Sequence, residues 1–178
     1  MICVGIDVAK DKHDCFILSS EGKVLADVFT IPNLSLIHIY VIPTFALAKV
    51  QFDMRDKLDP IVGKKIAIAY ENHCRTWELA LKAKLKIGVG TDFFPGPDNA
   101  RERELLVDLG MRPMEVIQAA TKTGAEVLMR DDIGVLEDGK LADIIVVAGN
   151  PLDNMGLLRN ADHIKLVMQE GKIVKQIA

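Results

Sequence analysis

The sequence predicts an α/β fold that is one slice of an α/β barrel or open sheet. Three observations predict it: helical spacing over residues 66–85, a buried strand over 86–94, and helical spacing again over 101–128. The 178 residues make about one domain, since domains average ~150 residues. A closed α/β barrel needs eight strands and about 250 residues, so we expect only part of one.

The first 31 residues are expected to form a three-stranded antiparallel sheet. Residues 2–8 are rich in β-branched side chains. Two further apolar stretches, HDCFILSS and VLADVFTI, flank Glu21-Gly22-Lys23, which is typical of a tight hairpin turn.

Residues 28–48 carry no formally charged side chain and match a membrane span in length. However, Pro32 and Pro43 interrupt any single helix there, and the Val, Ile, Phe and Tyr content favours strands. We therefore expect two buried strands with a break between them, and no membrane partner.

A long helix is expected next, because apolar side chains recur at steps of three and four residues: Ile66, Tyr70, Cys74, Trp77, Leu81 and Leu85. His73 lies beside that face and is expected to be partly buried. In the following strand, 86–94, Gly88 and Gly90 allow close packing. Asp92 stands at the carboxyl end of this strand.

Two more helices and a small β unit complete the chain. Gly110 suits the end of a helix over 101–109, and Pro113 suits the first position of a helix that runs to Leu128. The tail returns to strands at residues 143–148, 163–168 and 172–175, with a turn at Gly171.

Charge and cysteine content exclude several classes of protein. The 22 Lys and Arg face 25 Asp and Glu, so the net charge of −3 gives no basic excess for strong non-specific binding to nucleic acid. The 3 Cys form no C-x-x-C pair, which favours reduced thiols in the cytoplasm. The start, MICVGIDVAKDK, lacks the features of a targeting segment.

Asp92 is the first candidate for chemistry. An acidic residue at the carboxyl end of a barrel strand lies on the catalytic face, where a carboxylate can bind a divalent metal and accept a proton from metal-bound water. Alternatively, Asp92 caps the loop or helix that follows. The 4 His form no H-x-H or H-E-x-x-H pattern, so each is expected to be structural.

Asp7 is the second candidate. An Asp inside an apolar strand costs free energy unless it is paired or binds a metal. Enzymes of polynucleotidyl transfer place such an Asp on a first strand and add further carboxylates to complete a two-metal site. The alternative is an Asp that faces the surface from an edge strand.

Residues from about 41 to 178 resemble the carboxyl-terminal part of amidohydrolase-superfamily enzymes, and are most similar to the imidazolonepropionase-related and Xaa-Pro dipeptidase-like hydrolases. The motifs are KIGVGTDFF, ELLVDLGMRPMEVIQAATKTGAEVL, GVLEDGKLADIIVVAGNPLDN and HIKLVMQEGKIV. The resemblance implies an incomplete TIM barrel (its last strands and helices) over 41–130 and part of a small β-sandwich over 131–178. VIPTFALA would be the barrel strand before KIGVGTDFF.

The resemblance also implies a chemistry: hydrolysis of C–N bonds in small amides, dipeptides or cyclic amides by a divalent metal, Zn²⁺ in this family. Asp92 corresponds to the Asp of the family's GTD motif, a metal-site residue that moves a proton from the attacking water to the leaving amine. The H-x-H, the bridging Lys or Glu, and the later His ligands of the family are absent. We therefore expect little activity from this chain alone. Arg112 stands where the family has a Thr or Ser cap, an expected loss of about 1 kcal/mol.

Residues 1–33 resemble a different family, the insertion-sequence transposases with a RuvC-like, RNase H-type domain and an Asp-Glu-Asp-Asp site. The match is G-I-D-V-A-K followed by a hairpin, and Asp7 corresponds to the first catalytic Asp. This resemblance implies Mg²⁺ as cofactor and DNA as partner.

Residues 34–40, which include LSLIHI, fit neither family and resemble translated sequencing-adapter stretches. We hypothesise that the chain is a chimera of two truncated genes. A third, non-enzymatic possibility is that residues 2–31 pair as strands with the β unit at 133–177. The faces of the strands at 39–47 and 86–92 are expected to be exposed, and self-association would follow.

Overall fold

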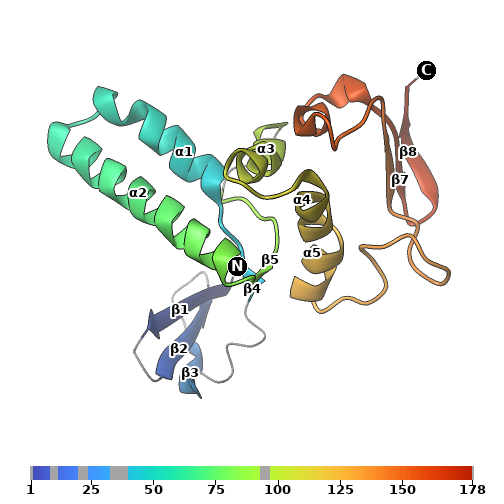
Figure 1. Cartoon of the computed structure of the whole chain (residues 1–178). Coiled ribbons are helices and arrows are strands. Elements are labelled where there is room, and N and C mark those ends of the chain that lie inside the picture. Colours follow the sequence, from blue (N-terminus) through green and yellow to red (C-terminus); the bar gives the residue numbers. More distant parts are fainter. Residues whose placement is uncertain (1, 9–11, 20–23, 33–39, 93–96, 178) are drawn as a thin grey trace. The chain divides into compact units, whose positions relative to one another are not determined.

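The computed structural model describes residues 2–8, 12–19, 24–32, 40–92 and 97–177. The chain divides into two compact units, residues 1–39 and 40–178, and each is described by itself (Figure 1). In the described part of the chain, no helix is both long enough and apolar enough to cross a membrane.

The first unit is a three-stranded antiparallel sheet with the strand order β1-β2-β3. Its strands are β1 Ile2–Val8, β2 Lys12–Ser19 and β3 Val24–Pro32. The antiparallel sheet predicted from the sequence is confirmed, whereas its expected turn at residues 21–23 lies outside the described residues. Asp7 lies on β1, and the β1–β2 register places its backbone opposite Asp14.

The second unit begins with a parallel strand pair and ends with an antiparallel sheet. Its strands are β4 Tyr40–Val41, β5 Lys86–Ile87, β6 Ile144–Val147, β7 Ile164–Gln169 and β8 Lys172–Gln176. Its α-helices are α1 Phe45–Met54, α2 Pro60–Lys82, α3 Arg101–Asp108, α4 Pro113–Ala120 and α5 Lys122–Val127. Its 3₁₀ helices are η2 Arg55–Lys57, η3 Pro97–Ala100, η4 Met155–Leu158 and η5 Ala161–His163.

β4 and β5 are much shorter than the sequence predicts. The expected strand over 39–47 is wrong beyond Val41, because the chain turns at Thr44 (φ 50°) and enters α1. The expected strand over 86–94 is wrong from Gly88 to Asp92, and its last two residues lie outside the described residues. Beyond β5, the N–H of Val89 donates to the carbonyl of Ala119 on α4, at 3.2 Å, instead of continuing the ladder with β4.

Close packing of the glycines after β5 is confirmed. A Cβ built on Gly88 would lie 2.6 Å from Cδ1 of Ile42, and one on Gly90 would lie 2.6 Å from Cγ2 of the same side chain. The absence of a side chain at both glycines therefore lets Ile42, just after β4, lie against the chain that leaves β5.

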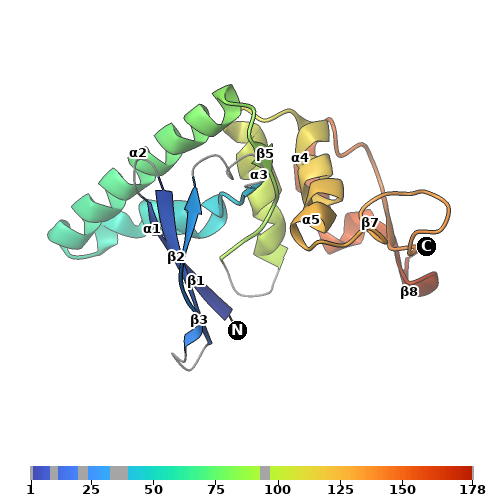
Figure 2. The ribbon, with the colours of Figure 1, turned by 90° about the horizontal axis from the view of Figure 1, so that it is seen from below.

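The predicted long helix is confirmed as α2, although Leu85 lies beyond its end. Asp59 caps it: Oδ1 accepts from the backbone N–H of Ile61 at 2.9 Å, and Pro60 occupies the first turn. Figure 2 shows α1 and α2 side by side, as they are in Figure 1, so that α1 covers part of the apolar face of α2.

The core of this unit joins α1, α2 and α3 around Phe45, which is fully buried. The ring of Trp77 on α2 meets the ring of Phe45 edge to face, with centroids 5.7 Å apart. Its Nε1 donates to the carbonyl of Leu109 at 3.0 Å. Aromatic pairs of this geometry add about 0.5–1.5 kcal/mol to the stabilisation from area burial.

The helices after β5 follow the predicted boundaries with one exception. Gly110 (φ 99°) follows the end of α3, and Pro113 begins α4, as expected. The continuous helix expected to Leu128 is wrong, because Thr121 leaves helical geometry (φ −119°, ψ −86°) and separates α4 from α5. Its hydroxyl donates to the carbonyl of Ile117, four residues back, at 2.7 Å.

The expected weakness at the start of α4 is offset. The backbone N–H of Arg112 donates to Oε2 of Glu115 at 3.2 Å, which is the reach-back half of a capping box. The guanidinium of Arg112 also donates to this carboxylate. Together these bonds replace part of what a Thr or Ser cap would supply.

The predicted β tail is confirmed as the antiparallel sheet β6-β7-β8. Its pairing with the first unit stays a prediction. The expected exposure of the strand faces is wrong for Phe45 and Ile87, which helices of the unit bury, whereas Ile42 is 37% exposed. On α2, Ile61 is 68% exposed and Leu79 59%, and self-association through such side chains stays a prediction.

Candidate functional site

The carboxyl ends of β4 and β5 lie at the same edge, because the two strands run parallel. Asp92 lies five residues beyond the end of β5, and it is exposed. The hydroxyl of Thr91, just before it, donates to Oδ1 of Asn99 at 3.3 Å. This contact holds the start of the β5–α3 connection against η3.

A buried carboxylate joins the two connections at this edge. Glu102, on the first turn of α3, is fully buried. Its two oxygens accept from the first backbone N–H groups of α1: Phe45 at 2.8 Å and Ala46 at 2.6 Å. The free N–H groups of a helix N-terminus are a favourable site for a carboxylate. Glu102 therefore fixes where α1 begins.

His73 supports the same connection from α2. Its ring stacks on Phe45 with centroids 4.0 Å apart and an interplanar angle of 12°. Burial lowers the pKa of His73, and a hydrogen bond to the backbone carbonyl of Pro43 partly opposes that shift. The partly buried, structural position predicted for His73 is confirmed.

Glu102 and His73 are expected to give the free energy of unfolding opposite pH dependences. Burial raises the pKa of Glu102 above 4.5, so its contribution is largest below 4.5 and is lost as the pH rises through the raised pKa. Burial lowers the pKa of His73 below 6.5, so its contribution is present above 6.5 and is lost as the pH falls.

Urea unfolding of the wild type, Glu102→Gln and His73→Asn between about pH 4 and pH 8 checks this expectation. Glu102→Gln should lose the stabilisation that the wild type gains on acidification. His73→Asn should lose the destabilisation that the wild type shows as the pH falls. Equal pH slopes in all three proteins would contradict both assignments.

The residues at this edge do not by themselves assemble a metal centre. Among the described residues, no group of three or more His, Cys, Asp or Glu side chains could hold a metal ion. Asp92 therefore lies five residues beyond β5, and the described residues around it do not supply the ligand set that a Zn²⁺ site requires. Asp7 belongs to the first unit, and its role stays a prediction.

Sequence reasoning missed Glu102. Its partners are the N–H groups of Phe45 and Ala46, 57 and 56 positions away along the chain. The local signal is only that of an acidic side chain in the first turn of a helix, which is common on exposed helices. No pattern within α3 distinguishes Glu102, which is fully buried, from Glu104, which is only partly buried.

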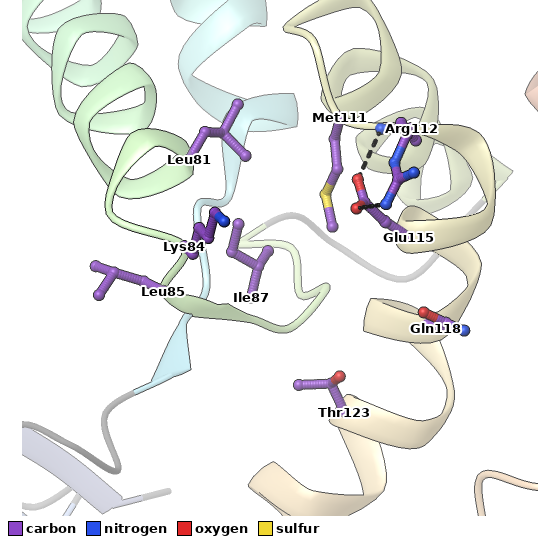
Figure 3. Close-up of a pocket in the computed structure, with 9 residues that line it drawn as sticks. All are labelled: Leu81, Lys84, Leu85, Ile87, Met111, Arg112, Glu115, Gln118 and Thr123. Carbon is purple, nitrogen blue, oxygen red and sulfur yellow. Dashed lines mark hydrogen bonds and ion pairs between the residues drawn. The ribbon is translucent and has the colours of Figure 1, made fainter.

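A pocket of about 560 Å³ lies near the start of β5, between the end of α2 and the helices α4 and α5 (Figure 3). Ile87 and Met111 form part of its apolar wall, and Figure 3 shows Arg112 bonded to Glu115 beside them. This pocket lies beside the residues that precede β5, whereas Asp92 comes after β5 in the chain. The two are separate features.

A parallel strand pair flanked by helices, with a small antiparallel sheet after it, places the second unit in the α/β class. Residues 56–174 match the amidohydrolase family. The chain belongs to this family.

Sequence relatives include the ochratoxinase of Aspergillus niger, 31% identical over 117 residues, which cover 62% of this chain and 24% of the relative. The imidazolonepropionase of Caldanaerobacter subterraneus subsp. tengcongensis is 32% identical over 91 residues, which cover 48% of this chain and 22% of that protein. The chain thus spans about a quarter of the length of the curated relatives that it matches.

Similar solved structures include A. niger ochratoxinase, with a TM-score of 0.73 and 27% identity over 78% of this chain and 32% of that one. Another is a Xaa-Pro dipeptidase with methionine bound in its active site, with a TM-score of 0.68 and 30% identity over 76% of this chain and 34% of that one. These likenesses confirm the amidohydrolase resemblance derived from the sequence.

Proposed function

We propose that the chain is the last part of a metal-dependent amidohydrolase barrel that hydrolyses C–N bonds in small amides, dipeptides or cyclic amides. The observation that supports this proposal is that Asp92 follows the carboxyl end of β5 by five residues, within the segment that matches the family. The similar structure of a Xaa-Pro dipeptidase supports dipeptide substrates, with Xaa-Pro dipeptides as the first class to test.

In this proposal Asp92 acts as a general base and then a general acid. Its exposed carboxylate takes a proton from the attacking water and gives it to the leaving amine. Glu102 has a positioning role, because it holds the start of α1 against α3 beside the same edge. The described residues of this chain supply no set of metal ligands, and in this proposal the remaining ligands come from other strands of the barrel.

The first test is an assay of the purified chain after incubation with Zn²⁺, with an Xaa-Pro dipeptide as substrate. We expect no hydrolysis above the metal blank, because the site is incomplete. Turnover that is lost in Asp92→Asn but kept in Asp108→Asn, a change at an exposed residue of α3, would overturn the expected inactivity.

A second candidate function rests on the first unit. We propose residues 1–33 as the start of a transposase-like domain in which Asp7 binds Mg²⁺ and acts on DNA, and its antiparallel β1–β3 sheet with Asp7 on the first strand favours this assignment. Retention of radiolabelled duplex DNA on a filter at low salt, with loss at high salt, is the expected result. No retention at any salt concentration would count against it.

We also propose that the chain is a chimera with four parts. Residues 1–33 are transposase-like, 34–40 are the junction, 41–130 are the barrel segment and 131–178 are the β unit. Long-read sequencing of source DNA across codons 25–50 tests it. Molecules that span the junction would establish one gene. If none does, the two segments belong to separate genes, and the chain has no function of its own.

A further inference from the structure

A cavity of about 390 Å³ lies between α3, α4 and the β6–β7 sheet, and neither Asp92 nor Glu102 is among its lining residues. Its walls are mainly apolar, with Ile117, Ile145, Val147, Leu158 and Ile164 among them. Cavities that bind small molecules usually measure about 300–1,000 Å³ and combine apolar walls with a few polar groups. This cavity has that size and composition.

Arg103 is the only charged residue that lines the described cavity. The other polar side chain in its wall, Thr121, already donates its hydroxyl to the carbonyl of Ile117 at 2.7 Å. Among the lining residues, Arg103 therefore supplies the charge, and its guanidinium has five N–H donors and a permanent positive charge.

Arg103 is partly buried, and its charge has no direct partner among the described residues. The neighbouring Glu102 does not neutralise it by contact, because the oxygens of that carboxylate accept from the backbone of α1. Burial lowers the pKa of Arg103, which reflects the loss of water around the cation. A partly desolvated guanidinium beside an apolar wall is complementary to an anion that carries an apolar body.

We propose that this cavity binds an apolar carboxylate anion, with the carboxylate on the guanidinium of Arg103 and the hydrocarbon body against α4, β6 and β7. Arginine favours carboxylates because its planar fork can make two parallel hydrogen bonds to them. The proposal does not rest on the proposed hydrolase activity, because binding at Arg103 requires no metal.

The test is calorimetric titration of the full chain with octanoate, octanol and acetate. Octanoate is expected to bind saturably, and octanol and acetate much more weakly, because each lacks one half of the complementary chemistry. Arg103→Gln is expected to weaken octanoate binding about ten- to hundredfold, the usual effect of removing a charged hydrogen-bond partner.

Two further variants make the test decisive. Arg101→Gln removes the same charge two residues away, where Arg101 faces Asp53 at 3.9 Å, and should leave octanoate binding unchanged. Ile145→Glu places a negative charge in the cavity wall at a residue that is 51% exposed, so the fold tolerates it, and should abolish binding. Absence of saturable octanoate binding, equal binding of octanol, or equal weakening by Arg101→Gln would each overturn the proposal.

Discussion

Replacing Glu102 with alanine is expected to lower the free energy of unfolding by about 3 kcal/mol. The change removes a fully buried carboxylate and leaves the N–H groups of Phe45 and Ala46 without their acceptor. It also removes the cap of α1 and opens a small cavity between α1 and α3. Urea denaturation followed by the fluorescence of Trp77, the single tryptophan, measures the loss beside the affected core.

Glu104→Ala is the matched control for this prediction. Glu104 lies on the same helix, two residues further on, and its Oε1 is buried with no hydrogen-bond partner among the described residues. Removing an unsatisfied buried oxygen relieves a desolvation cost, so this change should cost less than about 1 kcal/mol or should stabilise the protein. Equal losses from the two variants would show that Glu102 stabilises through helix propensity or packing rather than through its two hydrogen bonds.

The same residue explains where sequence reasoning failed. VIPTFALA has the β-branched and aromatic content of a strand, and its pattern alone favours one. The helix begins at Phe45 because the carboxylate of Glu102 satisfies the first N–H groups of α1. That interaction joins positions 57 residues apart, so no local window of the sequence contains it.

The elements predicted correctly are those whose determinants are local. Apolar spacing identifies α2, Gly110 marks the end of α3, Pro113 marks the start of α4, and alternating apolar stretches around Gly171 identify the last sheet. Strand length is different, because a strand extends only where a neighbour accepts its hydrogen bonds. β5 has β4 on one side, and its chain turns to the carbonyl of Ala119 after Ile87.

The candidate site likewise has one part that the sequence predicts and another that it does not. Asp92 could be found from the sequence, because it follows an apolar, glycine-containing stretch and is the Asp of a GTD motif. Its chemical partners could not, because the matched segment covers about a quarter of the related enzymes and the described residues around Asp92 include no metal-binding group. Ligands from distant strands come together only in the closed barrel, and one segment of the sequence does not encode that arrangement.

Completing the barrel is therefore expected to make Asp92 essential. We expect that co-expression of this chain with the part of the Xaa-Pro dipeptidase that precedes the matched segment gives hydrolysis of an Xaa-Pro dipeptide, while neither piece alone does. Asp92→Asn should then lower kcat by about 10²–10⁴-fold with little change in KM, because the amide keeps the size of the side chain and loses its basicity.

Asp108→Asn is the control in the completed barrel, since it removes an exposed carboxylate from α3 without touching the β4–β5 edge. Its kcat should stay within about twofold of the parent, as is usual for surface changes away from a site. If Asp92→Asn keeps the parent kcat, Asp92 only caps the chain that follows β5, and proton transfer belongs to another residue. If the two pieces together hydrolyse nothing, the assignment of residues 41–130 as the closing segment of such a barrel is wrong.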